Sequence, residues 1–163
     1  MAKYNYTEKK EKTKTLSYKN SVSPDFVEEV AEKILAKLMI EKKYRDPKYS
    51  AKQLATDIQV NSRHISAVIS LRFQQNYSQL VGKLRIYEAK YMLQDISFNK
   101  MTMEDIAINV GFTTRQSFYA TFYKLCGMTP KEYKQKYGFT PEPKPEKNAK
   151  SKRGRKSKRA KRA

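Results

Sequence analysis

The sequence predicts an all-α fold in which two three-helix subdomains are joined by a long linker helix and flanked by disordered basic termini. Apolar residues recur at helical spacing through residues 25–137, which hold almost all the Ile, Leu, Val and Phe. A short pattern within this part occurs twice, displaced by 52 residues. Residues 1–24 and 138–163 are polar and poor in aliphatic side chains, so they cannot bury enough apolar surface to offset the entropy of ordering.

Residues 25–43 are expected to form the first helix. Pro24 and Asp25 supply a start signal, and the pair Asp46-Pro47 is expected to end the helix. The apolar stripe of this helix consists of Phe26, Val27, Val30, Ile34, Leu35, Leu38 and Met39. A single stripe of this width usually faces a domain core; a dimer interface is the alternative interpretation.

A first helix-turn-helix unit is expected at about residues 51–73. Ser50 and Gln53 form a capping-box pattern at the start of a short helix. A tight turn separates this helix from a second one, residues 62–72, which Asn61 is expected to cap. The buried sides of the two helices are expected to consist of Leu54, Ala55, Ile58, Ile65, Val68 and Ile69. Helix, tight turn and helix is the helix-turn-helix arrangement.

The linker helix is expected at about residues 78–94. One side of it is lined by Leu80, Val81, Leu84, Ala89, Met92 and Leu93. A second helix-turn-helix unit follows at about residues 103–125, with a turn at Gly111 and a cap at Thr113. Its inward residues are Ile106, Ala107, Val110, Phe118 and Phe122. A last short helix begins at Thr129-Pro130, because a threonine cap followed by proline at the first helical position is a start signal.

The two units are related by an internal repeat. The stretch Leu54-Ala55-x-x-Ile58-x-Val60-Asn61-Ser62-Arg63 aligns with Ile106-Ala107-x-x-Val110-x-Phe112-Thr113-Thr114-Arg115. Beyond that point Ile65 and Ile69 match Phe118 and Phe122 at a displacement of 53. A repeat of apolar pattern, cap and arginine position indicates two copies of one structural unit.

The second copy resembles the signature of the AraC/XylS family of DNA-binding domains. The matching stretch is Ile106-Ala107-x-x-Val110-Gly111-Phe112-x5-Phe118-x3-Phe122-x4-Gly127-x-Thr129-Pro130-x-x-Tyr133, and the linker pattern Leu84-Arg85-x3-Ala89-x3-Leu93 fits as well. The resemblance covers roughly residues 26–137. It implies a bacterial transcription regulator with two helix-turn-helix subdomains, each placing its second helix in the major groove of double-stranded DNA.

Two residues of the first unit depart from the family pattern. Gln59 stands in the turn and Gln74 before the linker helix, where the family usually has glycine. If either position has a positive φ, glutamine costs about 1 kcal/mol or more relative to glycine. The departures put the rigidity of the first subdomain in question, not its fold.

The spacing of the inward residues, together with the resemblance, predicts which residues touch DNA. Arg63 and Arg115 can bind guanine O6 and N7 bidentately, and Gln116 can bind adenine. Ala67 stands where relatives often carry a long base-reading side chain, so we expect the first unit to read sequence weakly or by DNA shape. The expected contacts are Ser62, Arg63, Ser66, Ala67, Ser70, Thr114, Arg115, Gln116, Tyr119, Lys124 and Lys131. The alternative interpretation is an ordinary solvated surface at each position.

The charge of the chain indicates a polyanionic partner. There are 35 basic against 16 acidic side chains, a net charge of +19, and residues 138–163 alone hold eleven basic and two acidic ones. Nucleic acid and an anionic membrane surface both fit such a charge. Arg153-Gly154-Arg155 is only a weak match to a minor-groove AT-hook. The tail residues expected to bind DNA nonspecifically are Lys152, Arg153, Arg155, Lys156, Lys158 and Arg159.

Several function classes are disfavoured by the sequence. We find no nucleophile–base pair, phosphate loop or metal-ligand cluster, so neither an enzyme nor a cofactor site is expected. His64 and Cys126 are interpreted as packing residues. Without a signal peptide or membrane span, a cytoplasmic, nucleoid-associated protein is expected. RNA polymerase is a further candidate partner, and no small-molecule effector site is evident. The alternatives are a low-specificity architectural DNA-binding protein and an RNA-associated binder that uses the basic tail.

Overall fold

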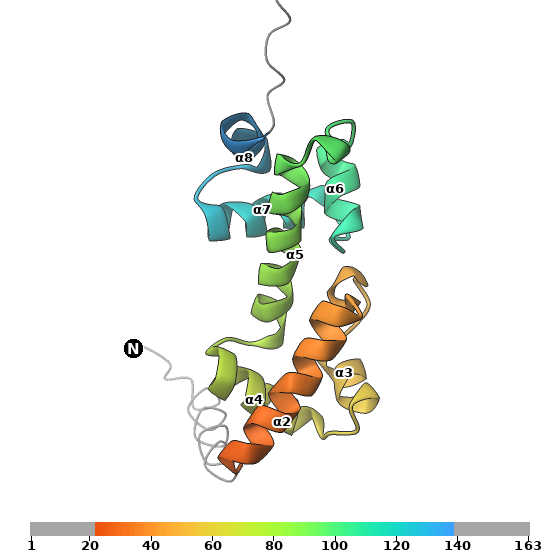
Figure 1. The fold of residues 1–163 in the computed structure, drawn as a ribbon, viewed down its shortest axis with the longest axis vertical. Coiled ribbons are helices and arrows are strands. Elements are labelled where there is room, and N and C mark those ends of the chain that lie inside the picture. The colour runs from red at the N-terminus through yellow and green to blue at the C-terminus, as the bar shows by residue number, and fades with distance from the viewer. Residues whose placement is uncertain (1–21, 139–163) are drawn as a thin grey trace, which may run out of the picture.

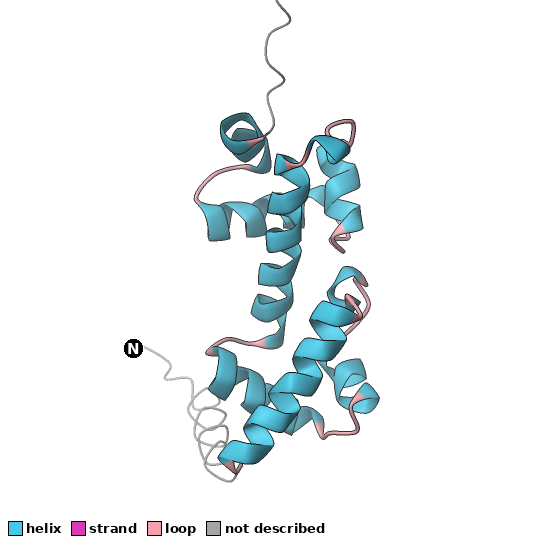
Figure 2. Ribbon diagram, viewed as in Figure 1, coloured by secondary structure: helices cyan, strands magenta, loops and turns pink. Residues whose placement is uncertain are grey.

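The computed structural model describes residues 22–138, which form seven α-helices and no strand (Figures 1 and 2). In chain order they are α2 (Pro24–Leu35), α3 (Ala51–Asp57), α4 (Ser62–Phe73), α5 (Tyr77–Gln94), α6 (Met103–Asn109), α7 (Arg115–Cys126) and α8 (Pro130–Tyr137). Figure 1 shows α2, α3 and α4 at one end of α5 and α6, α7 and α8 at the other. The expected all-α fold is therefore confirmed. The predictions for residues 1–21 and 139–163 lie outside the described residues.

The first helix is shorter than residues 25–43. Ser23 caps α2 by accepting a hydrogen bond from the amide of Phe26 (3.3 Å), as the start signal at Pro24 predicted. After Leu35 the chain continues as one π-helical turn, η1 (Ala36–Ile40), and a 3-10 turn, η2 (Lys43–Arg45), follows. Lys42 has a φ of 52°, and a left-handed residue cannot continue a right-handed helix. The helix therefore ends before the expected Asp46-Pro47 signal.

The first subdomain has an aliphatic core between α2, α3, α4 and the start of α5. Its fully buried members are Val30, Ile34, Leu38, Leu54, Ile65, Val68 and Ile69. Tyrosines close its edge: the Tyr77 hydroxyl donates to the Tyr49 carbonyl (2.8 Å), and the Tyr49 hydroxyl donates to Asp57 Oδ2 (2.8 Å). Burial raises the pKa of Tyr77 to about 12. These tyrosines therefore stay neutral donors at physiological pH.

The linker helix α5 serves two cores with its two halves. Leu80 and Val81 are buried in the core of the first subdomain. Ile86, Ala89, Met92 and Leu93 are buried in that of the second. One continuous helix thus supplies a wall to each subdomain, and the predicted apolar side is confirmed with Ile86 as an addition.

The second subdomain has an aromatic core. The Phe118 ring centroid lies 5.4 Å from that of Phe112 and 5.7 Å from that of Phe122, and Phe122 lies 5.5 Å from Tyr133. Such tilted and edge-on pairs are the preferred arrangements of aromatic rings. The inward positions predicted for α7 and α8 are therefore confirmed.

The cap of α7 is Thr114 rather than the expected Thr113. The side chain of Thr114 accepts a hydrogen bond from the amide of Ser117 (3.1 Å), and α7 begins at Arg115. A capping side chain accepts a hydrogen bond from an amide two or three residues further along the chain. Thr113 and Thr114 are adjacent capping residues, so the sequence alone did not distinguish them.

Both units have a residue of positive φ at the same two places, the turn and the end of the second helix. The turns contain Gln59 at 57° and Gly111 at 98°. The second helices of the two units, α4 and α7, which we call the recognition helices, end at Gln74 at 54° and Gly127 at 69°. Glutamine thus takes the left-handed conformation at both departures from the family pattern. Each costs about 1 kcal/mol relative to glycine.

Candidate nucleic-acid interface

The N-terminal half of α4 presents a polar face to solvent. Asn61 caps the helix by accepting a hydrogen bond from the amide of Arg63 (2.8 Å). Ser62, Arg63 and Ser66 are exposed, and the Ser66 hydroxyl donates to the carbonyl of Ser62 (3.1 Å). Ser70, one turn further, is half-buried. The structure therefore brings Ser62, Arg63 and Ser66 together on one exposed face, as predicted.

The prediction that Ala67 faces DNA is wrong. Ala67 is only 3% exposed. Helix α4 packs against α2, α3 and α5, so its buried arc reaches from Ala67 round to Ile69. At 100° per residue that arc is about 200° wide. A helix with three neighbours buries a wider arc than the single apolar stripe that the sequence predicts.

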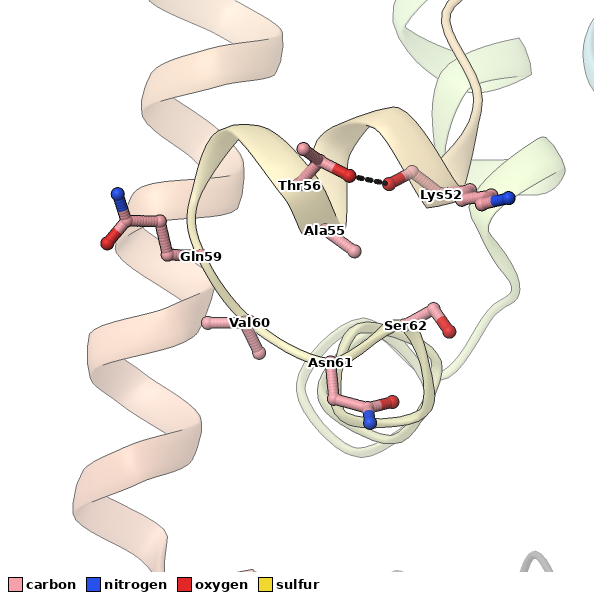
Figure 3. A pocket seen from close by; sticks show the side chains of 7 residues that line it. All are labelled: Lys52, Ala55, Thr56, Gln59, Val60, Asn61 and Ser62. Carbon is pink, nitrogen blue, oxygen red and sulfur yellow. Dashed lines mark hydrogen bonds between the residues drawn. The ribbon is translucent and has the colours of Figure 1, made fainter.

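A hollow lies beside the start of α4 (Figure 3). It has a volume of about 370 Å³ and is lined by Lys52, Ala55, Thr56, Gln59, Val60, Asn61 and Ser62. The Thr56 hydroxyl donates to the carbonyl of Lys52 (3.1 Å) within α3. Gln59 points outward from the turn in Figure 3. Lys52 therefore stands at the edge of the recognition helix, where the sequence interpretation had placed no contact.

The exposed face of α7 carries the other predicted contacts. Arg115 and Gln116 are exposed and Tyr119 is half-buried. Thr114 is exposed as well, but its hydroxyl is engaged as the helix cap. Lys124 near the end of α7 and Lys131 at the start of α8 are exposed. The tail residues from Lys152 to Arg159 lie outside the described residues.

Arg115 is held in place by two neighbours. Its guanidinium lies over the Tyr119 ring, 5.0 Å from the centroid, and its Nη1 donates to Glu104 Oε1 (3.1 Å). Tyr119 and then Glu104 raise the pKa of Arg115 above its ordinary value. Glu104 lies in the first turn of the neighbouring helix α6. The sequence analysis did not connect Glu104 with Arg115.

The corresponding position of the first unit carries the opposite charge. Arg63 corresponds to Arg115 in the internal repeat, and Lys52, two residues before the repeat begins, corresponds to Glu104 at the same displacement of 52. Within residues 22–138 Arg63 forms no ion pair. This difference could have been found from the sequence, because the two aligned positions carry charges of opposite sign.

The remaining sequence-predicted packing residues are confirmed as such. His64 is half-buried, and its ring centroid lies 5.1 Å from that of Phe26 on α2. Cys126 packs at the edge of the second core, and burial raises the pKa of its thiol. Among the described residues no group of three or more His, Cys, Asp or Glu side chains is placed to hold a metal ion. None of the described helices is both long and apolar enough to cross a membrane.

The chain is similar in sequence to known regulators. A family model described as a helix-turn-helix domain matches residues 54–136. The melibiose operon regulatory protein of Escherichia coli (strain K12) is 26% identical over 90 residues, which are 55% of this chain and 29% of that protein. This chain therefore spans less than a third of the length of that relative.

Solved structures share the fold. The C-terminal domain of AraT, a response regulator from Geobacillus stearothermophilus, superposes with a TM-score of 0.60 at 20% identity, covering 76% of this chain and 94% of that one. A transcriptional regulator from Chromobacterium violaceum, described as containing an AraC-type DNA-binding domain, gives a TM-score of 0.56 at 18% identity, covering 66% and 94%. In both cases nearly the whole of the compared structure is matched.

Proposed function

The chain belongs to the AraC-type helix-turn-helix family, and we propose that it is a transcription regulator that binds double-stranded DNA in a sequence-specific way. In this proposal α4 and α7 occupy two successive segments of the major groove. The observation that carries it is the pair of exposed polar faces, each at the start of the second helix of a helix-turn-helix unit.

The chemistry of the two faces suits DNA. Arginine can bind guanine O6 and N7 bidentately, and glutamine can bind adenine, so Arg115 and Gln116 are suited to read bases. Serine hydroxyls at Ser62 and Ser66 suit phosphate or base edges. Lys124 near the end of α7 and Lys131 at the start of α8 are exposed cations suited to phosphate contacts.

The length of α5 supports occupation of neighbouring groove segments. Its 18 residues span about 27 Å, and successive major-groove segments on one face of B-DNA recur about every 34 Å. A modest bend of the duplex would close this difference. The name of the Escherichia coli relative, an operon regulatory protein, supports a promoter as the target.

Selection from random DNA tests sequence specificity. The full chain would select duplexes from a random library, and its affinity for the selected operator would be compared with that for a random duplex at fixed salt. We expect the operator to bind at least about a thousandfold more tightly. A ratio near one would contradict the proposal and favour a protein that coats DNA without reading it.

A second candidate function is low-specificity DNA coating, favoured by the eleven basic side chains of residues 138–163. Deletion of residues 139–163 separates the two. Each lost phosphate contact reduces the slope of log affinity against log salt by about 0.9. If the tail only adds nonspecific affinity, this slope becomes flatter and the operator-to-random ratio stays the same or rises. Loss of operator preference would show that the tail reads DNA itself. An unchanged slope would assign the tail to another partner, such as RNA.

A further inference from the structure

The turn of the second unit lies directly against a segment of the first subdomain. Gly111 is buried, and a Cβ atom added there would lie 2.5 Å from the carbonyl oxygen of Arg45 and 2.8 Å from that of Tyr44. Real Cβ atoms do not approach backbone so closely, so only glycine allows this contact. The turn between α6 and α7 and the η2 turn are therefore in backbone contact.

Arg85 of α5 binds backbone carbonyls in and next to η2. Its Nε donates to the carbonyl of Tyr44 (2.6 Å) and its Nη2 to the carbonyl of Asp46 (3.2 Å). The same guanidinium lies 5.5 Å from the ring centroid of Phe112 in the second unit. Burial lowers the pKa of Arg85, yet an arginine remains charged in proteins. One cation thus contacts both subdomains.

Glu88, one turn further along α5, binds the side chains of η2. Glu88 Oε2 accepts hydrogen bonds from the Tyr44 hydroxyl (3.0 Å) and from Arg45 Nε (2.9 Å), and a second nitrogen of Arg45 contacts Oε1. The Glu88 side chain is only 12% exposed. Burial alone would raise the pKa of Glu88, but the hydrogen bonds from Arg45 and Tyr44 outweigh it and hold the pKa below its ordinary value. Bidentate, charge-assisted bonds of this kind are directional as well as strong.

We propose that Tyr44, Arg45, Arg85, Glu88 and Gly111 form an inter-unit clasp, which fixes the orientation of the two helix-turn-helix units and thereby the spacing of DNA segments that the chain accepts. The inference rests on the proposed function for its DNA half. With α5 as the only connection, the units could rotate about it by bending or fraying the helix. The clasp adds a second attachment beside the axis of α5. Such a rotation then requires the hydrogen bonds of Arg85 and Glu88 with η2 and Asp46 to break.

The spacing between the two DNA segments then contributes to specificity, because DNA is helical. One inserted base pair turns the second segment by about 35° relative to the first. A rigid pair of units cannot follow that rotation without losing contacts at one segment or distorting the duplex. A pair joined by α5 alone would adapt at a lower cost.

The first experiment measures the orientation without DNA. Spin labels are placed on Leu71→Cys and Leu125→Cys, two exposed positions at the ends of α4 and α7, in a Cys126→Ser background. Distances are measured by pulsed electron resonance in the full chain. We expect one narrow distribution, which broadens when Arg45→Ala and Glu88→Gln are combined. A distribution that stays narrow in this double variant overturns the clasp.

Arg72→Ala is the matched control. Arg72 pairs with Glu28 of α2 (3.0 Å), an exposed arginine–glutamate pair of similar sequence separation that lies entirely within the first subdomain. We expect its distance distribution to remain narrow. Circular dichroism checks that every variant keeps its helix content, and Glu88→Gln alone preserves side-chain size should the double variant unfold. Broadening in Arg72→Ala equal to that in the double variant would overturn the assignment to the clasp.

The second experiment measures spacing on DNA. The selected operator is remade with one base pair inserted or removed between its two protected segments. We expect the natural chain to lose about tenfold or more in affinity, and the double variant about threefold or less. Equal losses in both proteins, or no loss in the natural chain, overturn the spacing claim. If the natural chain protects only one segment, the proposed function fails, while the distance measurement still decides the clasp.

Discussion

The turn of the first helix-turn-helix unit contains Gln59, that of the second contains Gly111, and both residues have a positive φ. Gln59 is exposed, and its turn borders an open hollow. Gly111 is buried against the backbone of η2, where a Cβ atom has no room. Both turns therefore require a residue of positive φ, but only the second also requires a residue without a side chain. Glutamine is tolerated where strain is the only cost.

The recognition arginines differ in a parallel way. Arg115 is fixed by Glu104 and Tyr119, whereas Arg63 corresponds to it in a unit that has Lys52 in place of Glu104. A pre-positioned arginine loses less conformational entropy when it binds a base. Lys52 and Arg63 are both exposed cations, and such charges favour phosphate. We therefore expect the second unit to read bases and the first mainly to bind the DNA backbone.

The largest expected effect separates the two glycines of the second unit. Gly111→Ala should lower the free energy of unfolding by about 3 kcal/mol or more, because strain at positive φ adds to a clash with the Arg45 carbonyl. Gly127→Ala is the control, since a Cβ atom there meets nothing within 4 Å; it should cost about 1 kcal/mol. Urea denaturation followed by circular dichroism measures both. Equal losses would contradict the packing role of Gly111.

The next effect separates the two recognition faces. Arg115→Ala and Gln116→Ala should each weaken binding to the selected operator by about 1–3 kcal/mol and leave random-DNA binding nearly unchanged. Arg63→Ala should weaken binding to both duplexes by a similar factor, because a phosphate contact carries no sequence information. Titrations on both duplexes measure this. The division of roles is wrong if Arg63→Ala proves the more selective change.

A smaller effect tests the strain in the first unit. Gln59→Gly should raise the free energy of unfolding by about 0.5–1 kcal/mol, since glycine adopts its φ of 57° without a steric penalty. Hydrogen exchange of the α3 and α4 amides locates the gain, which should be confined to the first subdomain. Gln53→Gly, in the first turn of α3, is the control and should destabilise the helix. No gain at Gln59 would mean that the turn is not strained.

The smallest effect concerns the charges beside the two arginines. Glu104→Gln should strengthen random-DNA binding by a few-fold and reduce the operator preference. The effect should be small because the exposed ion pair that holds Arg115 contributes only about 0.2–1 kcal/mol. Lys52→Gln should weaken binding to operator and random duplexes equally. Affinities at two salt concentrations measure both. Identical responses of the two variants would remove the electrostatic distinction between the units.

Periodicity predicted the helices well and their environments less well. The inward residues of α4 and α7 followed from spacing because each core contact repeats at the helical period. Burial of Ala67 did not follow, since it depends on α2 packing against α4 from a distant part of the sequence. The end of the first helix at Ile40 depends on the left-handed Lys42, which no glycine marks. The contacts of Arg85 and Glu88 with η2 require the three-dimensional arrangement of segments about 40 residues apart.

A protection footprint of the full chain on its selected operator tests the central claim most directly. Methylation protection reads guanine N7 in the major groove, which is covered by any helix that lies in the groove as well as by an arginine that binds the base. The account predicts two protected patches on one face of the duplex, centred about one helical turn apart. Arg115→Ala should expose guanines in one patch only, while Arg63→Ala leaves the pattern of both patches unchanged. A single protected patch, or uniform protection along the duplex, would contradict an account in which two unequal units occupy successive grooves.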